Sequence, residues 1–203
     1  MARVVRVGLT AVVVLVMAGA LAWLLGLVRM RPTPVGRPGG GASGGGPLPP
    51  LVRPRLLVEK TQHRLTLYDG DAVVRTFRAA VGRGAGDKVR EGDGCTPEGD
   101  FYVCMKNPQS KYTLSLGLSY PTEEDAARGL RDALITQARH DEIVQALRAG
   151  GQPPWDTPLG GEIMIHGRGA GRDWTAGCIA LDDPDITLLF HALSVGTPVR
   201  IVP

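Results

Sequence analysis

Cys178 and His166 are the two side chains whose types and spacing suit nucleophilic catalysis. A thiol at its ordinary pKa is only a few per cent thiolate at neutral pH, so a nucleophilic cysteine needs a nearby imidazole or a helix N-terminus. His166 ends the apolar segment 162–166, and Cys178 follows Gly177 after eleven intervening residues. If the two segments form neighbouring strands, the side chains meet, and the pair would suit acyl transfer.

The same pair also fits an ordinary structural role, with a buried cysteine in a strand and a hydrogen-bonded histidine. The segment 168–176 between them favours a site, because it is rich in glycine and polar residues yet contains Trp174. That mixture suits a binding loop better than a core. Gly177 permits close backbone approach or a positive φ, and the N–H groups of Gly177 and Cys178 could stabilise an oxyanion.

Four segments resemble the L,D-transpeptidase catalytic domain family. Met164–Gly167 (Met-Ile-His-Gly) and Thr175–Leu181 (Thr-Ala-Gly-Cys-Ile-Ala-Leu) are similar to its His-Gly and Ser/Thr-x-Gly-Cys motifs. Upstream, Gln62–Tyr68 resembles the early hairpin of the family, and Thr96–Phe101 is similar to its Thr-Pro-x-Gly-x-Phe turn. The resemblance extends over most of residues 55–202.

The resemblance implies an enzyme that acts on peptidoglycan stem peptides without a cofactor, with Cys178 as nucleophile and His166 as general base. In this family the cysteine attacks the bond after meso-diaminopimelate, and an amine then resolves the acyl-enzyme. A wall-linked protein or a D-amino acid is a further candidate partner. Gly177, Thr175 and Gly167 would shape the pocket and its oxyanion site.

Ala180 departs from the family pattern, which commonly has Arg two residues after the nucleophile. A branch with Gly-Cys-x-Ala-Leu, which includes enzymes resembling hydrolases of wall-linked peptides, is closer, and segment 107–121 is also similar to it. Within that segment Lys111 and Tyr112 are candidate substrate contacts, as is Trp174, although Lys111 and Tyr112 also fit solvated loop positions. An L,D-peptidase or amidase, and a non-catalytic peptidoglycan-binding module, therefore remain alternatives to a transpeptidase.

Short strands dominate the elements predicted to position these residues. Apolar or alternating runs predict strands at 56–58, 64–68, 72–77, 101–103, 162–166, 177–181 and 197–202. Thr122 and the acidic residues after it predict a helix from Glu123 to Leu147 with a break around His140, and a shorter helix runs from Asp182 or Asp183 to about Leu193. The expected fold is mainly β, an L,D-transpeptidase-like sandwich or barrel with one or two inserted helices.

Residues 7–28 form an uncharged apolar run of about 22 residues, and a helix of roughly 20 crosses a bilayer core. Arg3 and Arg6 favour a cytoplasmic N-terminus. Small triplets such as Ala18-Gly19-Ala20 resemble a signal-peptidase site, so cleavage and secretion are the alternative. The predicted organisation is a transmembrane anchor or signal segment (1–31), a Pro/Gly-rich linker (32–50) and a catalytic domain (51–203) in the bacterial envelope, outside the inner membrane.

The formal charge of +3 belongs to the N-terminal segment. Residues 1–50 hold five arginines and no acidic residue, and removing them from 23 Lys+Arg leaves 18 against 20 Asp+Glu in residues 51–203, a net of −2. A slightly acidic domain without a basic cluster lacks the electrostatic footprint of a nucleic-acid-binding protein.

Cys95 and Cys104 bracket a short segment, and an oxidising exterior would permit them to form a disulfide. Two buried free thiols are the alternative.

His63, His140 and His191 show no paired ligand spacing, and no C-x-x-C is present, so no metal site is expected. Segment 82–87 is glycine-rich but lacks the Gly-Lys-Ser/Thr ending of a phosphate loop, and we interpret it as an ordinary flexible turn inside the unusually long loop 82–99.

Overall fold

A computed structural model describes residues 46–203, so the predicted anchor at 1–31 and most of the predicted linker at 32–50 lie outside the described residues. No helix within residues 46–203 has the length and apolar character needed to traverse a bilayer.

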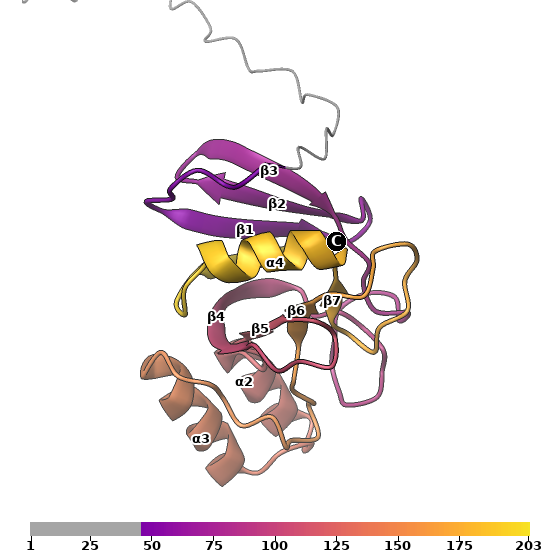
Figure 1. The fold of residues 1–203 in the computed structure, drawn as a ribbon. Helices are drawn as coiled ribbons and strands as arrows, with labels where there is room; N and C mark the ends of the chain where they lie inside the picture. Colours follow the sequence, from indigo (N-terminus) through magenta and orange to yellow (C-terminus); the bar gives the residue numbers. More distant parts are fainter. Residues whose placement is uncertain (1–45) are drawn as a thin grey trace, which may run out of the picture. The chain divides into compact units, whose positions relative to one another are not determined.

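The described part of the chain is mainly β, as predicted, and is built on one eight-stranded sheet. Its order is β3-β2-β1-β8-β4-β5-β6-β7, so the C-terminal strand lies beside the first strand. Figure 1 shows the sheet curled, with α4 packed along it. The strands are β1 (Pro54–Glu59), β2 (Arg64–Asp69), β3 (Ala72–Arg78), β4 (Gly99–Asn107), β5 (Ser115–Leu118), β6 (Met164–His166), β7 (Ile179–Ala180) and β8 (Pro198–Val202).

Alternation along the strands creates the core. In β1 and β2 the antiparallel register sets Leu56 opposite Leu67 and Val58 opposite Leu65, all four almost completely buried. Because successive side chains point to opposite faces, these positions form one apolar layer. That layer continues into β5, β6 and β7 through Leu116, Ile165 and Ile179 and is covered by Ile186 and Leu189 of α4 (Asp183–Ala192).

The two edge strands meet at one end of the sheet. Ala80, just after β3, and Ala180 of β7 form an isolated antiparallel bridge, with N–H···O distances of 2.9 and 2.8 Å. A second bridge joins Gly82 to Thr175. The sheet therefore closes on itself beside the predicted nucleophile.

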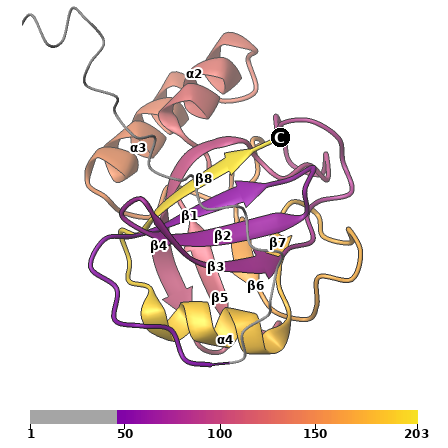
Figure 2. The same cartoon turned by 90° about the horizontal axis from the view of Figure 1, so that it is seen from above.

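The predicted helical stretch 123–147 is interrupted, as predicted, but the break lies earlier than His140. Residues Glu123–Arg131 form α2, and Gln137–Arg148 form α3, so His140 lies inside a helix. The break occurs earlier because Ala133 has a φ of 56° and Thr136 caps the next helix by accepting a hydrogen bond from the N–H of Arg139. The α2–α3 pair lies on the other side of the strands from α4 (Figures 1 and 2).

The strands beside the site are shorter than predicted. Strand β6 begins at Met164 because Glu162 has a φ of 53°, and β7 is restricted to Ile179–Ala180 because Gly177 has a φ of 135°. A positive φ takes the backbone out of the extended conformation. Strand β5 was not predicted at all, although it supplies the partner of β6.

Candidate active site

Strands β6 and β7 confirm the predicted neighbourhood of the two chemical residues. They are parallel, with Ile165 opposite Ile179 and His166 opposite Ala180. Ile165 and Ile179 face the core, so alternation directs His166 and Cys178, which directly precedes β7, toward the opposite face. The pair lies one diagonal step apart, roughly 8 Å between Cα atoms from strand geometry.

The Cys178 thiol is half-buried and held by backbone groups. Its S–H donates to the carbonyl of Glu162 at 3.4 Å, and its Sγ accepts from the N–H of Met164, also at 3.4 Å. Burial raises the pKa of Cys178, and the Met164 hydrogen bond opposes that shift. The resting group is therefore a neutral thiol, and no hydrogen bond joins it to the His166 side chain among the described residues.

The His166 imidazole is fixed in one orientation. Its Nδ1 lies 2.7 Å from the carbonyl oxygen of Gly167, which can only accept, so Nδ1 carries the proton and Nε2 keeps a free lone pair. The ring of Tyr112 stacks on it at 4.5 Å, and Trp174 approaches at 5.6 Å with an interplanar angle of 66°. Burial lowers the pKa of His166 against the opposing effect of the Gly167 hydrogen bond.

Thr175 spans the turn that carries Cys178. Its buried hydroxyl donates to the carbonyl of Cys178 at 2.7 Å and accepts from the N–H of Gly177 at 3.2 Å. The Gly177 amide is thus engaged, whereas the Cys178 amide has no acceptor within residues 46–203. Of the two predicted oxyanion donors, only the Cys178 amide is unoccupied.

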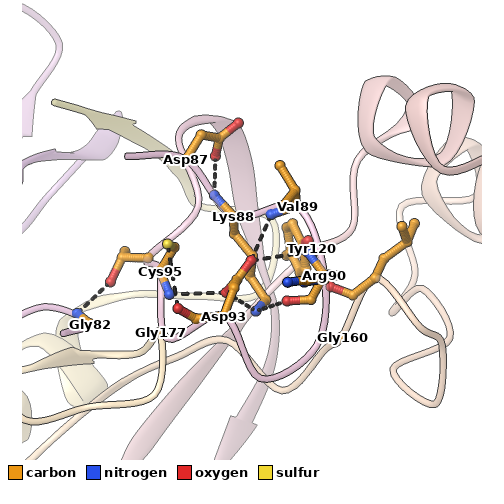
Figure 3. Close-up of polar contacts among 12 residues, drawn as sticks. Gly82, Asp87, Lys88, Val89, Arg90, Asp93, Cys95, Tyr120, Gly160 and Gly177 are labelled. Carbon is orange, nitrogen blue, oxygen red and sulfur yellow. Dashed lines mark hydrogen bonds and ion pairs between the residues drawn. The ribbon is translucent and has the colours of Figure 1, made fainter. Parts of the chain in front are cut away.

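The loop 82–98 packs against this turn at Gly177 and contains a buried ion pair between Lys88 and Asp93 (Figure 3). The Asp93 carboxylate accepts from the Lys88 ammonium at 2.9 Å and from the backbone N–H groups of Val89, Arg90 and Cys95 at 2.8–3.0 Å. Although burial opposes it, these hydrogen bonds lower the pKa of Asp93 to about 2.

That loop is tightly packed, which differs from the flexible turn expected at 82–87. A Cβ on Gly82 would lie 2.1 Å from the carbonyl oxygen of Gly94, and one on Gly177 would lie 2.7 Å from that of Cys95. The Gly82 N–H also donates to the buried Thr96 hydroxyl at 2.8 Å. Glycine is therefore required where the loop meets the nucleophile turn.

Gly167 links His166 to its neighbours. Its N–H donates to the carbonyl of Tyr112 at 3.0 Å, and a Cβ there would lie 2.3 Å from Oδ1 of Asp183. Gly167 therefore acts by allowing close packing, because a side chain at this position would displace Asp183.

Ala180 is fully buried opposite His166. It forms a small cluster with Ala80 and Ala170, and Trp174 packs against that cluster. The Trp174 indole is fixed by donating to the carbonyl of Gly169 at 3.1 Å. An arginine at position 180 would have to displace this ring.

A hollow of about 570 Å³ opens beside these aromatic rings, and its arginines were not among the predicted site residues. Lys111 does not line it but lies exposed with Nζ 5.1 Å from the Tyr112 ring. The only sequence signal for the arginines was their place in the glycine-rich segment between the two motifs. The hollow is lined by Tyr112, Arg168, Gly169, Gly171, Arg172 and Trp174.

The structure does not contain a Cys95–Cys104 disulfide. Both are free thiols, and their Sγ atoms lie near different carbonyl oxygens, those of Ala85 and Gly117. Among residues 46–203 no three His, Cys, Asp or Glu side chains converge in a way that could hold a metal ion.

Comparisons with known proteins agree with this architecture. The family model of the YkuD L,D-transpeptidase catalytic domain matches residues 53–201. No curated protein sequence matches the chain.

Two solved structures are similar to this chain at low identity. The helical cell shape determining protein Pgp2 from Campylobacter jejuni is 22% identical, with a TM-score of 0.50 over 73% of this chain and 47% of that one. An L,D-transpeptidase from Xylanimonas cellulosilytica is 19% identical, with a TM-score of 0.44 over 77% of this chain and 64% of that one. This chain thus spans about half to two thirds of those structures, and the Pgp2 likeness shows the fold alone.

Proposed function

The chain belongs to the YkuD L,D-transpeptidase catalytic domain family, and from this premise we propose that it transfers acyl groups of peptidoglycan stem peptides through a Cys178 acyl-enzyme. One observation carries the proposal: His166 ends β6 and Cys178 directly precedes the adjacent strand β7, with His166 Nε2 left free as a base. The family supports the substrate class, and the geometry supports the two roles that we propose.

The first step begins from two neutral groups. Burial raises the pKa of Cys178 and lowers that of His166, so an ion pair is disfavoured at rest. The S–H turns from the Glu162 carbonyl toward Nε2 of His166 as a peptide carbonyl approaches, and proton transfer accompanies attack. The Met164 N–H, already on Sγ, stabilises the developing thiolate.

The tetrahedral intermediate places a negative oxygen near the nucleophile backbone. The Cys178 amide is the donor without an acceptor within residues 46–203, so we assign it to that oxygen. Removing one such donor in other acyl-transfer sites costs about 10²–10³ in kcat. Thr175 fixes the direction of this N–H by clamping the turn on both sides of Cys178.

Collapse of the intermediate breaks the C–N bond and leaves a thioester on Cys178, while the imidazolium of His166 returns its proton to the leaving amine. An incoming amine then yields a cross-link or an attached protein or D-amino acid, whereas water yields a shortened peptide. We propose amine transfer as the main outcome because the family is that of the L,D-transpeptidases. No cofactor or metal takes part in these steps.

Incubation of the full chain with muropeptides, with products read by mass spectrometry, tests this function. The wild type should give a covalent adduct on Cys178 and a product carrying the acceptor amine. Cys178→Ala should give neither, and His166→Ala should lose electrophile labelling of Cys178. Hydrolysed product alone would replace transpeptidation by L,D-peptidase or amidase activity, and retention of peptidoglycan without any adduct would indicate a binding module.

We also propose that residues 1–31 anchor the protein to the inner membrane through the linker 32–50, with the catalytic domain in the periplasm or outside the cell. The support is the uncharged 22-residue run at 7–28 together with Arg3 and Arg6. Membrane fractionation of the full chain before and after a carbonate wash distinguishes an anchor from a cleaved signal, because only an uncleaved anchor stays in the pellet.

A further inference from the structure

The hollow beside His166 carries two exposed cations, and the only carboxylate that contacts either residue within residues 46–203 is that of Asp183, through the backbone N–H of Arg168. Arg168 and Arg172 both line it and both are exposed, and neither forms an ion pair within residues 46–203. The nearest acid in the sequence, Asp173, is turned away from the hollow, because its carboxylate accepts from the Val81 N–H at 2.9 Å and contacts His63 at 2.9 Å. The two guanidinium charges are thus available to an anion from outside.

The backbone under Arg168 is held in place. Arg168 has a φ of 75°, a conformation that is rare for a residue with a Cβ. Its N–H donates to Oδ1 of Asp183 at 2.7 Å, which also accepts from the Thr113 hydroxyl at 2.9 Å. The guanidinium lies 5.8 Å from the Tyr112 ring centroid. A strained backbone fixed by a carboxylate directs this side chain over the aromatic wall.

The hollow and His166 share two neighbouring aromatic residues. Tyr112 and Trp174 line it, and the rings of both contact the imidazole of His166. The hollow therefore lies next to the two rings that flank His166, and His166 itself does not line it. His166 must protonate the leaving amine and later deprotonate an incoming one, so the amine side of the scissile bond lies here.

An α-amino acid carries its amine and its carboxylate on the same carbon. If its amine lies at His166 Nε2, its carboxylate lies within the reach of side chains that line the adjoining hollow. A planar guanidinium is well matched to a carboxylate because it can donate two parallel hydrogen bonds. Gly169 and Gly171 also line the hollow, and because they have no side chains they leave space between the two arginines.

Resting on the proposed function, we infer that Arg168 and Arg172 form a subsite for the free α-carboxylate of the D-amino acid that leaves from, or adds to, the Cys178 acyl-enzyme. In acylation the C–S bond forms and the C–N bond breaks, the thiol proton passes through His166 to the amine, and the amino acid departs with its carboxylate on the arginines. Charge at this end of the substrate thus becomes a determinant of specificity.

Two synthetic stem peptides test the inference. They share the diaminopimelate donor and differ only at the C-terminal D-amino acid, which ends in a free carboxylate in one and in a carboxamide in the other. The full chain in detergent is assayed by mass spectrometry for the acyl-enzyme and the released amino acid. The wild type should prefer the carboxylate peptide by about tenfold in kcat/KM, the factor expected for one charge-assisted hydrogen bond.

Arg168→Gln and Arg172→Gln should each reduce that preference through KM, and the double variant should abolish it, so that kcat/KM becomes equal for the carboxylate and carboxamide peptides. Arg131→Gln is the matched control, because Arg131 is an exposed arginine on α2 and its loss changes the net charge equally. The wild-type preference should be retained in this variant.

The two possible failures are distinguishable. Cys178-dependent product with an unchanged carboxylate preference in the double variant would overturn the subsite alone. Absence of Cys178-dependent product from both peptides would overturn the proposed function and the subsite with it.

Discussion

The phenol ring of Tyr112 stacks on the imidazole of His166, with ring centroids 4.5 Å apart and an interplanar angle of 23°. The backbone makes the same connection, because the Tyr112 carbonyl accepts from the N–H of Gly167 at 3.0 Å. Tyr112 comes from the loop between β4 and β5, and His166 ends β6. The His166 imidazole is therefore positioned by a loop more than fifty residues upstream.

Replacing Tyr112 should test how much the stack contributes. Tyr112→Phe keeps the ring and should acylate at nearly the wild-type rate, whereas Tyr112→Ala should lower kcat by roughly 3- to 10-fold, the range for an aromatic pair. The alanine variant also exposes His166, so the pKa seen in its pH–rate profile should rise toward the ordinary value. Equal rates for the two variants at every pH would show that the stack does not position the base.

Burial of His166 makes stability depend on pH in a definite direction. The folded-state pKa lies below the ordinary 6.5, so the unfolded state binds more protons as the pH falls through 6.5, and folding loses stability there. The loss stops below the folded-state pKa. Urea unfolding between pH 4 and 8 should show a smaller decline for His166→Gln than for the wild type, and identical declines would contradict a buried neutral imidazole.

Gly177 should be intolerant of a side chain. Its φ is 135°, and a Cβ would lie 2.7 Å from the carbonyl of Cys95, so Gly177→Ala should cost about 2 kcal/mol or more of unfolding free energy. Gly171→Ala is the matched control in the same loop, because nothing lies within 4 Å of its Cβ position. Thermal unfolding of the two variants measures the difference. Equal stabilities would contradict a steric requirement for glycine at position 177.

The sequence predicted the two strands next to His166 and Cys178 because these strands depend on local signals. An apolar run ending in His166 and a glycine before Cys178 specify two buried strands, and alternation then predicts which side chains share a face. The resemblance to the two family motifs was what linked His166 with Cys178. Both strands begin two residues later than predicted, because the positive φ of Glu162 and Gly177 depends on tertiary packing.

The rest of the site depends on long-range contacts that no short window contains. Strand β5 was missed because its four residues are all buried and show no alternation, and Gly117 interrupts them. Arg168 resembles any solvated loop arginine until the fold places Tyr112 beneath it. The engagement of the Gly177 amide by Thr175 likewise appears only in three dimensions.

The buried Lys88–Asp93 pair should be the most sensitive ionic contact of the described chain. Their side chains are only 3% and 11% exposed, and the contact is 2.9 Å. Removing one partner of a buried pair costs about 3–5 kcal/mol, because the other charge stays buried without compensation. Asp93→Asn should therefore destabilise strongly, and more than Lys88→Met, since Asp93 retains three backbone donors when the ammonium is lost.

A surface ion pair provides the control, and urea unfolding at pH 7 measures the stability of each variant. Glu142→Gln removes the exposed contact to Arg139 and should cost less than about 1 kcal/mol. Because the pKa of Asp93 is about 2, the contribution of Asp93 to stability is complete above the unfolded value of 3.8 and is lost as the pH falls from there toward 2.

The loop that contains the pair also packs on Gly177, so Asp93→Asn should change electrophile labelling of Cys178, whereas Glu142→Gln should not. Unaltered stability and labelling in Asp93→Asn would show that the pair does not support the turn that carries Cys178.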